Sequence, residues 1–305
     1  MYDLVIIGGG PAGVGAGVYA ARKKIKTLFI TDTFGGQSLV SSDVQNWIGT
    51  KSVSGYDLGK MLEEHLRAHS DIEILESKWV NGVSKNDKGF MVTTVDGGSY
   101  ETRTVLLTSG SRRRKLDVPG EKELDGKGVA YCSTCDAPLF AGKIVAVIGG
   151  GNAGLEAVVD LLNYASKIYL LVRSEAPKGD PVTYEKIKNS SKVQIITMAQ
   201  TTQVLGNKFV SGLKYKDLNI GEEKTLELQG VFVEIGALPN SDIVKSLVTL
   251  DNYGQIVVDH KTQRSSLLGI WAAGDVTDVL YKQNNISVGD AIKAVLNIVD
   301  YLGKE

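Results

Sequence analysis

One stretch decides the fold: Leu4-Val5-Ile6-Ile7-Gly8-Gly9-Gly10-Pro11-Ala12-Gly13. Its apolar, mostly β-branched start predicts a buried strand. Gly8, Gly10 and Gly13 then have the G-x-G-x-x-G spacing, which permits a tight turn and lets the backbone approach a pyrophosphate. An Ala- and Val-rich run up to Arg22 predicts a helix whose N-terminus suits an anion. Asp32 stands about 20 residues further on, where a ribose contact is expected. The stretch therefore predicts a dinucleotide site, without distinguishing FAD from NAD.

The same pattern returns later in the chain. Ile144 to Ile148 predict a second buried strand, Gly149, Gly151 and Gly154 repeat the glycine spacing, and a helical run continues to Leu162. One glycine motif is a weak signal, but two that each join a strand to a helix indicate two doubly wound, Rossmann-like α/β domains. The alternative is that the second site is vestigial and serves only as a scaffold.

Each nucleotide module carries a β-meander, since short alternating strands are expected within residues 75–107 and 193–233. A returning strand at Gly269–Ala273 and a helix from about Val288 then complete the first module. We expect the second module to be inserted in the first, with domains at 1–112 plus 241–305 and at 113–240. The two crossings, near Arg112 and Pro239, are candidate hinges.

The two cysteines of the chain lie in the tetrapeptide Cys132-Ser133-Thr134-Cys135. This spacing allows the sulfurs to cycle between dithiol and disulfide, and the adjacent Asp136 is a candidate proton donor or acceptor. The alternative, half of a zinc site, would need further ligands. The chain offers only its three histidines, of which His65 and His69 have helical spacing without a third partner.

Composition excludes several classes of protein. The net charge of −1 argues against nucleic acid as the main partner, and 43% hydrophobic with 23% charged residues indicate a globular chain rather than a disordered or membrane protein. Met1 is followed almost at once by the first strand, which leaves no room for a signal sequence. We expect a cytoplasmic protein, where a disulfide is more often catalytic than structural.

These motifs, together with Gly35-Gly36-Gln37, Asn46-Trp47 and Ala273-Gly274-Asp275, resemble the low-molecular-weight thioredoxin reductases over essentially the whole chain. The resemblance implies FAD in the first module. It places Gly8, Gly10 and Gly13 at the pyrophosphate, Gln37 and Asn46 near the flavin, Asp275 at the ribityl chain and Gln283 beside the isoalloxazine ring.

By the same resemblance, Cys135 faces the flavin, Cys132 is the outer thiol that attacks the substrate disulfide, and Asp136 handles the proton. The implied partner is thioredoxin or a thioredoxin-like protein, the implied assembly is a homodimer, and the inserted domain is expected to rotate. The C-terminal half is also similar to the flavoprotein subunit of alkyl hydroperoxide reductase, whose extra N-terminal thioredoxin-like domains this sequence lacks. An external thiol protein is therefore the expected acceptor, and a flavoprotein reductase of a peroxiredoxin system is the alternative. A redox-sensing flavoprotein without turnover is a third.

The electron donor is the point at which the sequence departs from the family. NADPH-dependent members carry a His-Arg-Arg run after the second strand of the inserted module, where guanidinium groups hold the 2′-phosphate. Here the stretch is Val172-Arg173-Ser174-Glu175, so only Arg173 remains, and no acidic residue closes the strand as an NADH site would require. NADPH bound through Arg173 is the leading interpretation, and NADH or ferredoxin are the alternatives. The basic run from Arg112 to Lys115 could contact a dinucleotide or an acidic partner, or be solvated surface.

Overall fold

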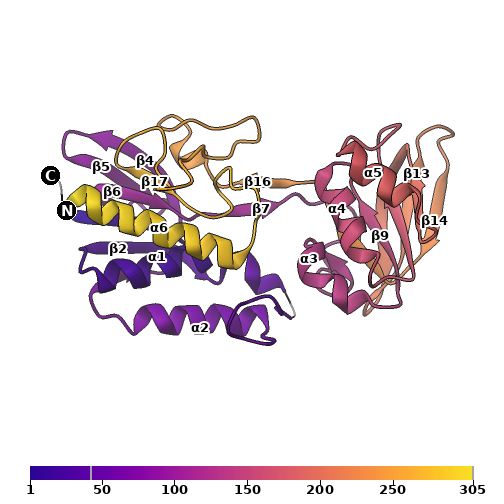
Figure 1. Ribbon diagram of the computed structural model, residues 1–305, viewed down its shortest axis with the longest axis horizontal. Helices are drawn as coiled ribbons and strands as arrows, with labels where there is room; N and C mark the ends of the chain where they lie inside the picture. The colour runs from indigo at the N-terminus through magenta and orange to yellow at the C-terminus, as the bar shows by residue number, and fades with distance from the viewer. Residues whose placement is uncertain (42, 304–305) are drawn as a thin grey trace. The chain divides into compact units, whose positions relative to one another are not determined.

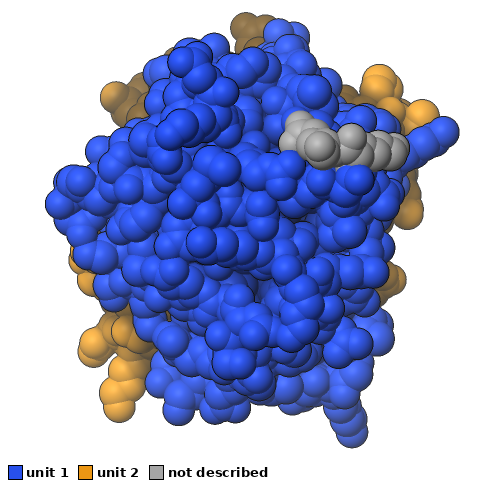
Figure 2. Space-filling model, turned by 90° about the vertical axis from the view of Figure 1, so that its left-hand side faces the viewer, with its two compact units in different colours: residues 1–112, 238–305 blue, residues 113–237 orange. Residues whose placement is uncertain are grey.

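The computed structural model describes residues 1–41 and 43–303, and the chain divides into two compact units. Unit 1 combines Met1–Arg112 with Leu238–Glu305, and unit 2 is the intervening segment Arg113–Ala237. Figure 2 shows the two segments of unit 1 as one continuous body, in blue. The predicted α/β class, with one Rossmann-type unit inserted in another, is confirmed.

A single sheet of order β3-β2-β1-β6-β5-β4 supports unit 1, with β17 paired to β6. Strands β1, β2, β3, β6 and β17 run parallel, whereas β4, β5 and the first half of β6 form the antiparallel meander. The strands are β1 (Tyr2–Gly9), β2 (Thr27–Phe34), β3 (Ile72–Leu75), β4 (Val80–Asn86), β5 (Gly89–Thr94), β6 (Ser99–Leu107) and β17 (Ile270–Ala272).

Three helices, α1 (Pro11–Arg22), α2 (Gly55–Arg67) and α6 (Asn284–Leu302), share one core with the sheet (Figure 1). Helix α2 shows how the sequence specifies such an element. Ser54 caps it by accepting the Asp57 N–H at 3.0 Å, and a leucine at every fourth position from Leu58 to Leu66 is buried. Short 3₁₀ turns occupy η1 (Gly36–Val40) and η3 (Asp242–Val244). Within the described residues, no helix combines the length and apolarity needed to cross a bilayer.

Helix α6 begins at Asn284, earlier than the start near Val288 that the apolar pattern predicts. Two amide side chains in the first turn explain the difference. Asn284 Nδ2 donates to Ser38 Oγ at 3.0 Å, and Asn285 Nδ2 donates to the Asn46 carbonyl at 2.7 Å. These bonds anchor the start of the helix to a distant loop, which a local hydrophobic pattern does not reveal.

Unit 2 contains a parallel sheet of order β11-β10-β9-β15-β8 and a separate antiparallel meander of order β12-β13-β14. Its strands are β8 (Val129–Ala130), β9 (Ile144–Ile148), β10 (Lys167–Leu171), β11 (Val193–Ile196), β12 (Ala199–Gly206), β13 (Val210–Asp217), β14 (Glu223–Glu227) and β15 (Gly230–Val233). Its helices are α3 (Ser133–Asp136), η2 (Ala137–Phe140), α4 (Asn152–Leu161) and α5 (Pro181–Lys188). Buried side chains form a core on each face of the parallel sheet.

The chain crosses between the units in β7 (Ser111–Arg113) and β16 (Ala237–Pro239), which pair with each other. Unit 1 resumes at Leu238 rather than at the expected residue 241. The physical reason is that Asn240 is already bonded into unit 1. Its N–H donates to the Gly110 carbonyl at 3.0 Å, and its side-chain amide donates to the Ser109 carbonyl at 2.8 Å.

Two helical glycines provide a test of this packing. A methyl group at Gly13, in α1, would overlap the carbonyl oxygen of Gly8, whereas one at the exposed Gly289, in α6, would meet nothing within 4 Å. We expect Gly13→Ala to lower the free energy of unfolding by about 3 kcal/mol. Gly289→Ala, the matched control, should raise it by about 0.5–1 kcal/mol. Urea unfolding followed by circular dichroism measures both, and equal effects would contradict the close approach.

Candidate active site

Unit 1 encloses a cavity of about 430 Å³ at the carboxyl ends of its parallel strands. The glycine turn Gly8–Ala12 forms one wall, and the end of β2, including Asp32, forms another. The returning segment Thr108–Arg112 and the C-terminal Asp275 complete it. The cavity therefore lies at the edge where doubly wound sheets bind their ligands.

The geometry of the glycine turn fits a pyrophosphate. Gly8 has φ +117° and lies so close to Thr108 that a Cβ would overlap the Thr108 carbonyl. Gly10, in contrast, has an open face, since the nearest atom to a Cβ there is Gly36 Cα at 3.9 Å. Gly10 also precedes α1 without a side-chain cap. The first N–H groups of α1 are therefore available to an anion lying over Gly10.

The residues predicted to bind FAD fall into two groups. Gly8, Gly10, Asp32, Gln37 and Asp275 line the cavity. The remaining three, among the described residues, stand outside its lining: Gly13, Asn46 and Gln283.

Each of these three has another contact. Gly13 packs against the Gly8 carbonyl, which is the role of a third glycine in joining helix to turn. Asn46 Nδ2 donates to Gln283 Oε1 at 3.2 Å, so these two residues tie a loop of the N-terminal segment to the start of α6.

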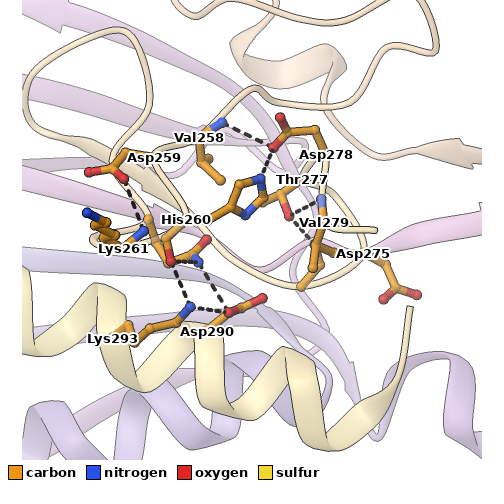
Figure 3. A network of polar contacts seen from close by, with 12 residues as sticks. Val258, Asp259, His260, Lys261, Asp275, Thr277, Asp278, Val279, Asp290 and Lys293 are labelled. Carbon is orange, nitrogen blue, oxygen red and sulfur yellow. Dashed lines mark hydrogen bonds and ion pairs between the residues drawn. The ribbon is translucent and has the colours of Figure 1, made fainter. Parts of the chain in front are cut away.

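Asp275 is placed at the cavity by the polar network behind it. The Gly274 carbonyl accepts a hydrogen bond from Thr277 Oγ1 at 2.8 Å, which closes the turn that carries Asp275. Asp278 Oδ1 lies 3.4 Å from His260 Nε2 on the far side of that turn. In Figure 3 the carboxyl group of Asp275 points away from this network. The network thus fixes the backbone and leaves the Asp275 side chain directed elsewhere.

Sequence reasoning missed several residues of the cavity. Asn284 and Ser287, on the first turns of α6, line it, as does Arg112. Arg112 Nη1 also donates to Asn240 Oδ1 at 2.9 Å. The basic run pointed to Arg112 as a possible dinucleotide contact, but nothing in the local sequence distinguished it from its neighbours. Lys115 of the same run pairs with Asp125 at 2.9 Å.

The redox turn lies in unit 2, directly after β8. Cys132 and Cys135 form a disulfide with their Cα atoms 5.3 Å apart. Asp136 N–H donates to the Cys132 carbonyl at 3.0 Å, which closes the single helical turn that carries both sulfurs. Ser133 Oγ and Thr134 Oγ1 donate to Asp160 Oδ2 of α4, at 2.9 and 3.2 Å. The turn is therefore anchored to the helix that follows the second glycine motif.

Two carboxyl groups beside this turn have raised pKa values. Burial raises the pKa of Asp136 to about 6, while the charge of Arg113 opposes the rise and that of Asp125 adds to it. Burial raises the pKa of Glu234 to about 7, against the opposing effects of Arg113 and the Ser133 N–H. Groups that titrate near neutral pH are suited to proton transfer. Sequence reasoning identified Asp136 but missed Glu234, whose signal was a charged residue directly after the buried strand β15.

The second glycine turn repeats the geometry of the first. Gly149 has φ +129° and approaches the Glu234 carbonyl so closely that a Cβ would overlap it. A Cβ at Gly154 would overlap the Gly149 carbonyl, and one at Gly151 would meet nothing within 4 Å. Helix α4 likewise begins without a side-chain cap. The turn therefore retains the open face and the free N–H groups that a pyrophosphate needs.

The loop after β10 folds back over this turn. Lys178 N–H donates to the Gly150 carbonyl at 2.7 Å, and Asp180 N–H donates to Asn152 Oδ1 at 2.8 Å. Val172, at the end of the strand, is buried, and its side chain carries no polar group that could bind a ribose. Arg173 is exposed at the start of the loop. The loop therefore exposes two cationic side chains, Arg173 and Lys178, together with the carboxylate of Glu175.

Comparisons with known proteins agree with this geometry. The pyridine nucleotide-disulphide oxidoreductase family matches residues 2–293. The F subunit of alkyl hydroperoxide reductase from Pseudomonas putida is 43% identical over 304 residues, which cover 99% of this chain and 58% of that protein. The chain thus spans a little over half the length of this relative.

Solved structures match over their whole length. Thioredoxin reductase of Streptococcus pyogenes has a TM-score of 0.92 and 31% identity, with 100% of this chain and 99% of that chain covered. Thioredoxin reductase of Giardia duodenalis has a TM-score of 0.92 and 29% identity, with 99% of each chain covered. Two Rossmann-type units, a disulfide between closely spaced cysteines and these matches lead to one conclusion: the chain belongs to the pyridine nucleotide-disulphide oxidoreductase family.

Proposed function

We propose that this chain is a FAD-dependent disulfide reductase. Electrons pass from NADPH to the Cys132–Cys135 disulfide, and from the reduced pair to a disulfide of thioredoxin or a similar small thiol protein. One observation carries the proposal. The disulfide and the second glycine turn lie at the same edge of one sheet, because they follow the parallel strands β8 and β9.

The residues that line the cavity of unit 1 offer groups suited to FAD. Gly8 and Gly10 would hold the pyrophosphate, Asp32 a ribose, and Asp275 the ribityl chain, with Gln37 nearby. A bound flavin accepts two electrons from a nicotinamide and can pass them to a disulfide. The chain's own contribution is a cradle of backbone N–H groups at the start of α1 and the carboxylates of Asp32 and Asp275 in the cavity lining.

The thiol chemistry belongs to the redox turn. The Cys132 thiolate attacks one sulfur of the substrate disulfide and forms a mixed disulfide, while the departing sulfur takes up a proton. The Cys135 thiolate then attacks Cys132 Sγ, which breaks the mixed disulfide, releases the second substrate thiol and restores the Cys132–Cys135 bond. Asp136, whose pKa burial raises to about 6, would accept the proton that a thiol loses.

An alternative acceptor has support from the relatives. The 43% identity to the F subunit of alkyl hydroperoxide reductase favours a second function, in which the reduced pair serves a peroxiredoxin system through a thioredoxin-like carrier. Both functions use the same disulfide, so they differ only in the protein that docks at the redox turn.

Anaerobic titration tests the proposal. The purified flavoprotein is mixed in turn with NADPH, NADH and reduced ferredoxin, and flavin bleaching and free thiols are measured before thioredoxin or a peroxiredoxin-linked carrier is added. We expect NADPH to bleach the flavin, to yield two thiols per chain, and to support reduction of thioredoxin. If NADH or reduced ferredoxin bleaches the flavin and NADPH does not, that compound replaces NADPH as the proposed electron donor. Bleaching without new thiols would overturn the disulfide step. No bleaching by any donor would favour a sensor without turnover.

Arg173 provides a test of the nucleotide. If its guanidinium group binds the 2′-phosphate, Arg173→Ala should raise the KM for NADPH by about tenfold, the loss of one charge-assisted hydrogen bond. The KM for NADH should stay unchanged. Lys208→Ala, which removes an exposed cation on a distant loop of the same unit, should alter neither constant. Equal effects of Arg173→Ala on both nucleotides would reject phosphate recognition at this residue.

The raised pKa of Asp136 predicts a pH dependence of stability. Its pKa of about 6 in the folded chain exceeds the ordinary 3.8. Between these values the folded chain keeps a proton that the unfolded chain has lost, so stability falls as the pH rises through this window. Asp136→Asn removes this fall in stability. Between pH 4 and pH 7.5, the free energy of unfolding of the variant should therefore rise by about 2 kcal/mol relative to that of the parent chain. Urea unfolding at both pH values measures this gain.

The exposed Glu156 supplies the control for that measurement, since Glu156→Gln should give no pH-dependent gain. A difference between Asp136→Asn and the parent that stays constant with pH would show that the carboxyl group of Asp136 is not held in its protonated form.

A further inference from the structure

Glu234 lies between the two turns that carry the chemistry of unit 2. It directly follows β15, and β15 pairs with β8 on one side and β9 on the other. All three strands run parallel, so their carboxyl ends meet at one edge. There β8 leads into the redox turn and β9 into the second glycine turn. The Glu234 carbonyl touches Gly149, which leaves no room for a Cβ there.

The side chain of Glu234 reaches the redox turn. Glu234 is 7% exposed, and its carboxylate lies beside the backbone N–H of Ser133, the residue after Cys132, which favours its ionised form. Asp160, from α4, accepts the hydroxyl groups of Ser133 and Thr134. Two carboxylates from different elements therefore lie at the turn: Asp160 binds its hydroxyl groups, and Glu234 lies beside the backbone N–H next to the outer cysteine.

The charges around Glu234 come from three elements. Arg113 of β7 favours its ionised form, whereas Asp136 of α3 and Asp160 of α4 oppose it. Burial has the largest effect and raises the pKa of Glu234 to about 7, so the side chain is charged above neutral pH and protonated below it. Its charge therefore changes in the range where a redox thiol ionises.

We propose that Glu234 is a positioning residue of the redox turn, whose buried carboxylate lies beside the Ser133 N–H and opposes the thiolate form of Cys132. A thiolate at the start of a helical turn is stabilised by free backbone N–H groups and destabilised by a neighbouring negative charge. Glu234 acts in both ways, because it lies at this N–H and supplies the charge. A charged Glu234 thus shifts the reduced pair toward its protonated form. This inference rests on the proposed function only in assigning Cys132 as the outer thiol.

The experiment isolates one sulfur. The chain has two cysteines, so Cys135→Ser leaves Cys132 as the sole thiol. In this background the rate of alkylation by iodoacetamide is measured from pH 5 to pH 9 on the purified flavoprotein. Glu234→Gln keeps a side chain of the same size with an oxygen beside the Ser133 N–H but removes the charge. It should move the profile to lower pH and raise the rate at pH 8 by about tenfold, the effect of one pKa unit.

Asp160→Asn is the matched control, since it removes a carboxylate from the same turn but leaves the Ser133 N–H in place. It should change the rate at pH 8 by less than threefold. An unchanged profile for Glu234→Gln, or an equal shift for Asp160→Asn, would overturn the assignment to Glu234. If circular dichroism shows that Glu234→Gln does not fold, Glu234→Asp is measured instead, because it keeps the charge. It should keep the profile close to that of the parent, and a shift to lower pH would reject the charge effect.

The measurement needs no nucleotide, no electron donor and no acceptor protein. It can therefore fail while the chain still reduces thioredoxin, and it can succeed if the proposed function is wrong.

Discussion

The structure depends on a steric constraint at its two glycine turns. In each turn the first glycine lies so close to the carbonyl at the end of a returning strand that a side chain on this glycine would overlap it. A side chain on the third glycine would likewise overlap the carbonyl of the first glycine. Gly8 and Gly149 adopt positive φ values of +117° and +129°, which L side chains rarely tolerate. Because the close approach joins strand, helix and returning strand at one point, it also fixes where the open face of the turn lies.

In unit 2 this constraint brings the chemistry to one edge. The middle strand β15 lies between the strand that leads to the cysteines and the strand that leads to the glycines. Its last residue is followed by Glu234, which contacts Gly149 through its backbone and Ser133 through its side chain. Parallel strands place the loops at their carboxyl ends along the same edge of the sheet, so a glycine turn and a disulfide can be neighbours without any dedicated connecting segment.

Much of the fold and part of the candidate site could be predicted from the sequence because the signals are local. The glycine spacings, the buried strands beside them and the cysteine pair with Asp136 each occupy fewer than about ten consecutive residues. Residues that act across long separations gave no such signal. Arg112 and Asn284 reach the cavity, and Asn46 bonds to Gln283 rather than lining it, through contacts that no local pattern encodes. The meeting of Glu234 with the redox turn joins positions about a hundred residues apart in sequence, which only strand pairing brings together.

The sequence by itself determined the two Rossmann-type modules, the order in which they occur and the redox pair, because backbone sterics and short-range periodicity depend on neighbouring residues alone. Tertiary structure decided which side chains face the cavity, where the inserted unit ends and which carboxyl groups are buried beside the cysteines. Burial is a property of the packed chain, and it raises the pKa values of Asp136 and Glu234 toward neutrality. The cysteines indicate redox chemistry, but only the packed structure places two carboxyl groups that titrate near neutral pH beside them.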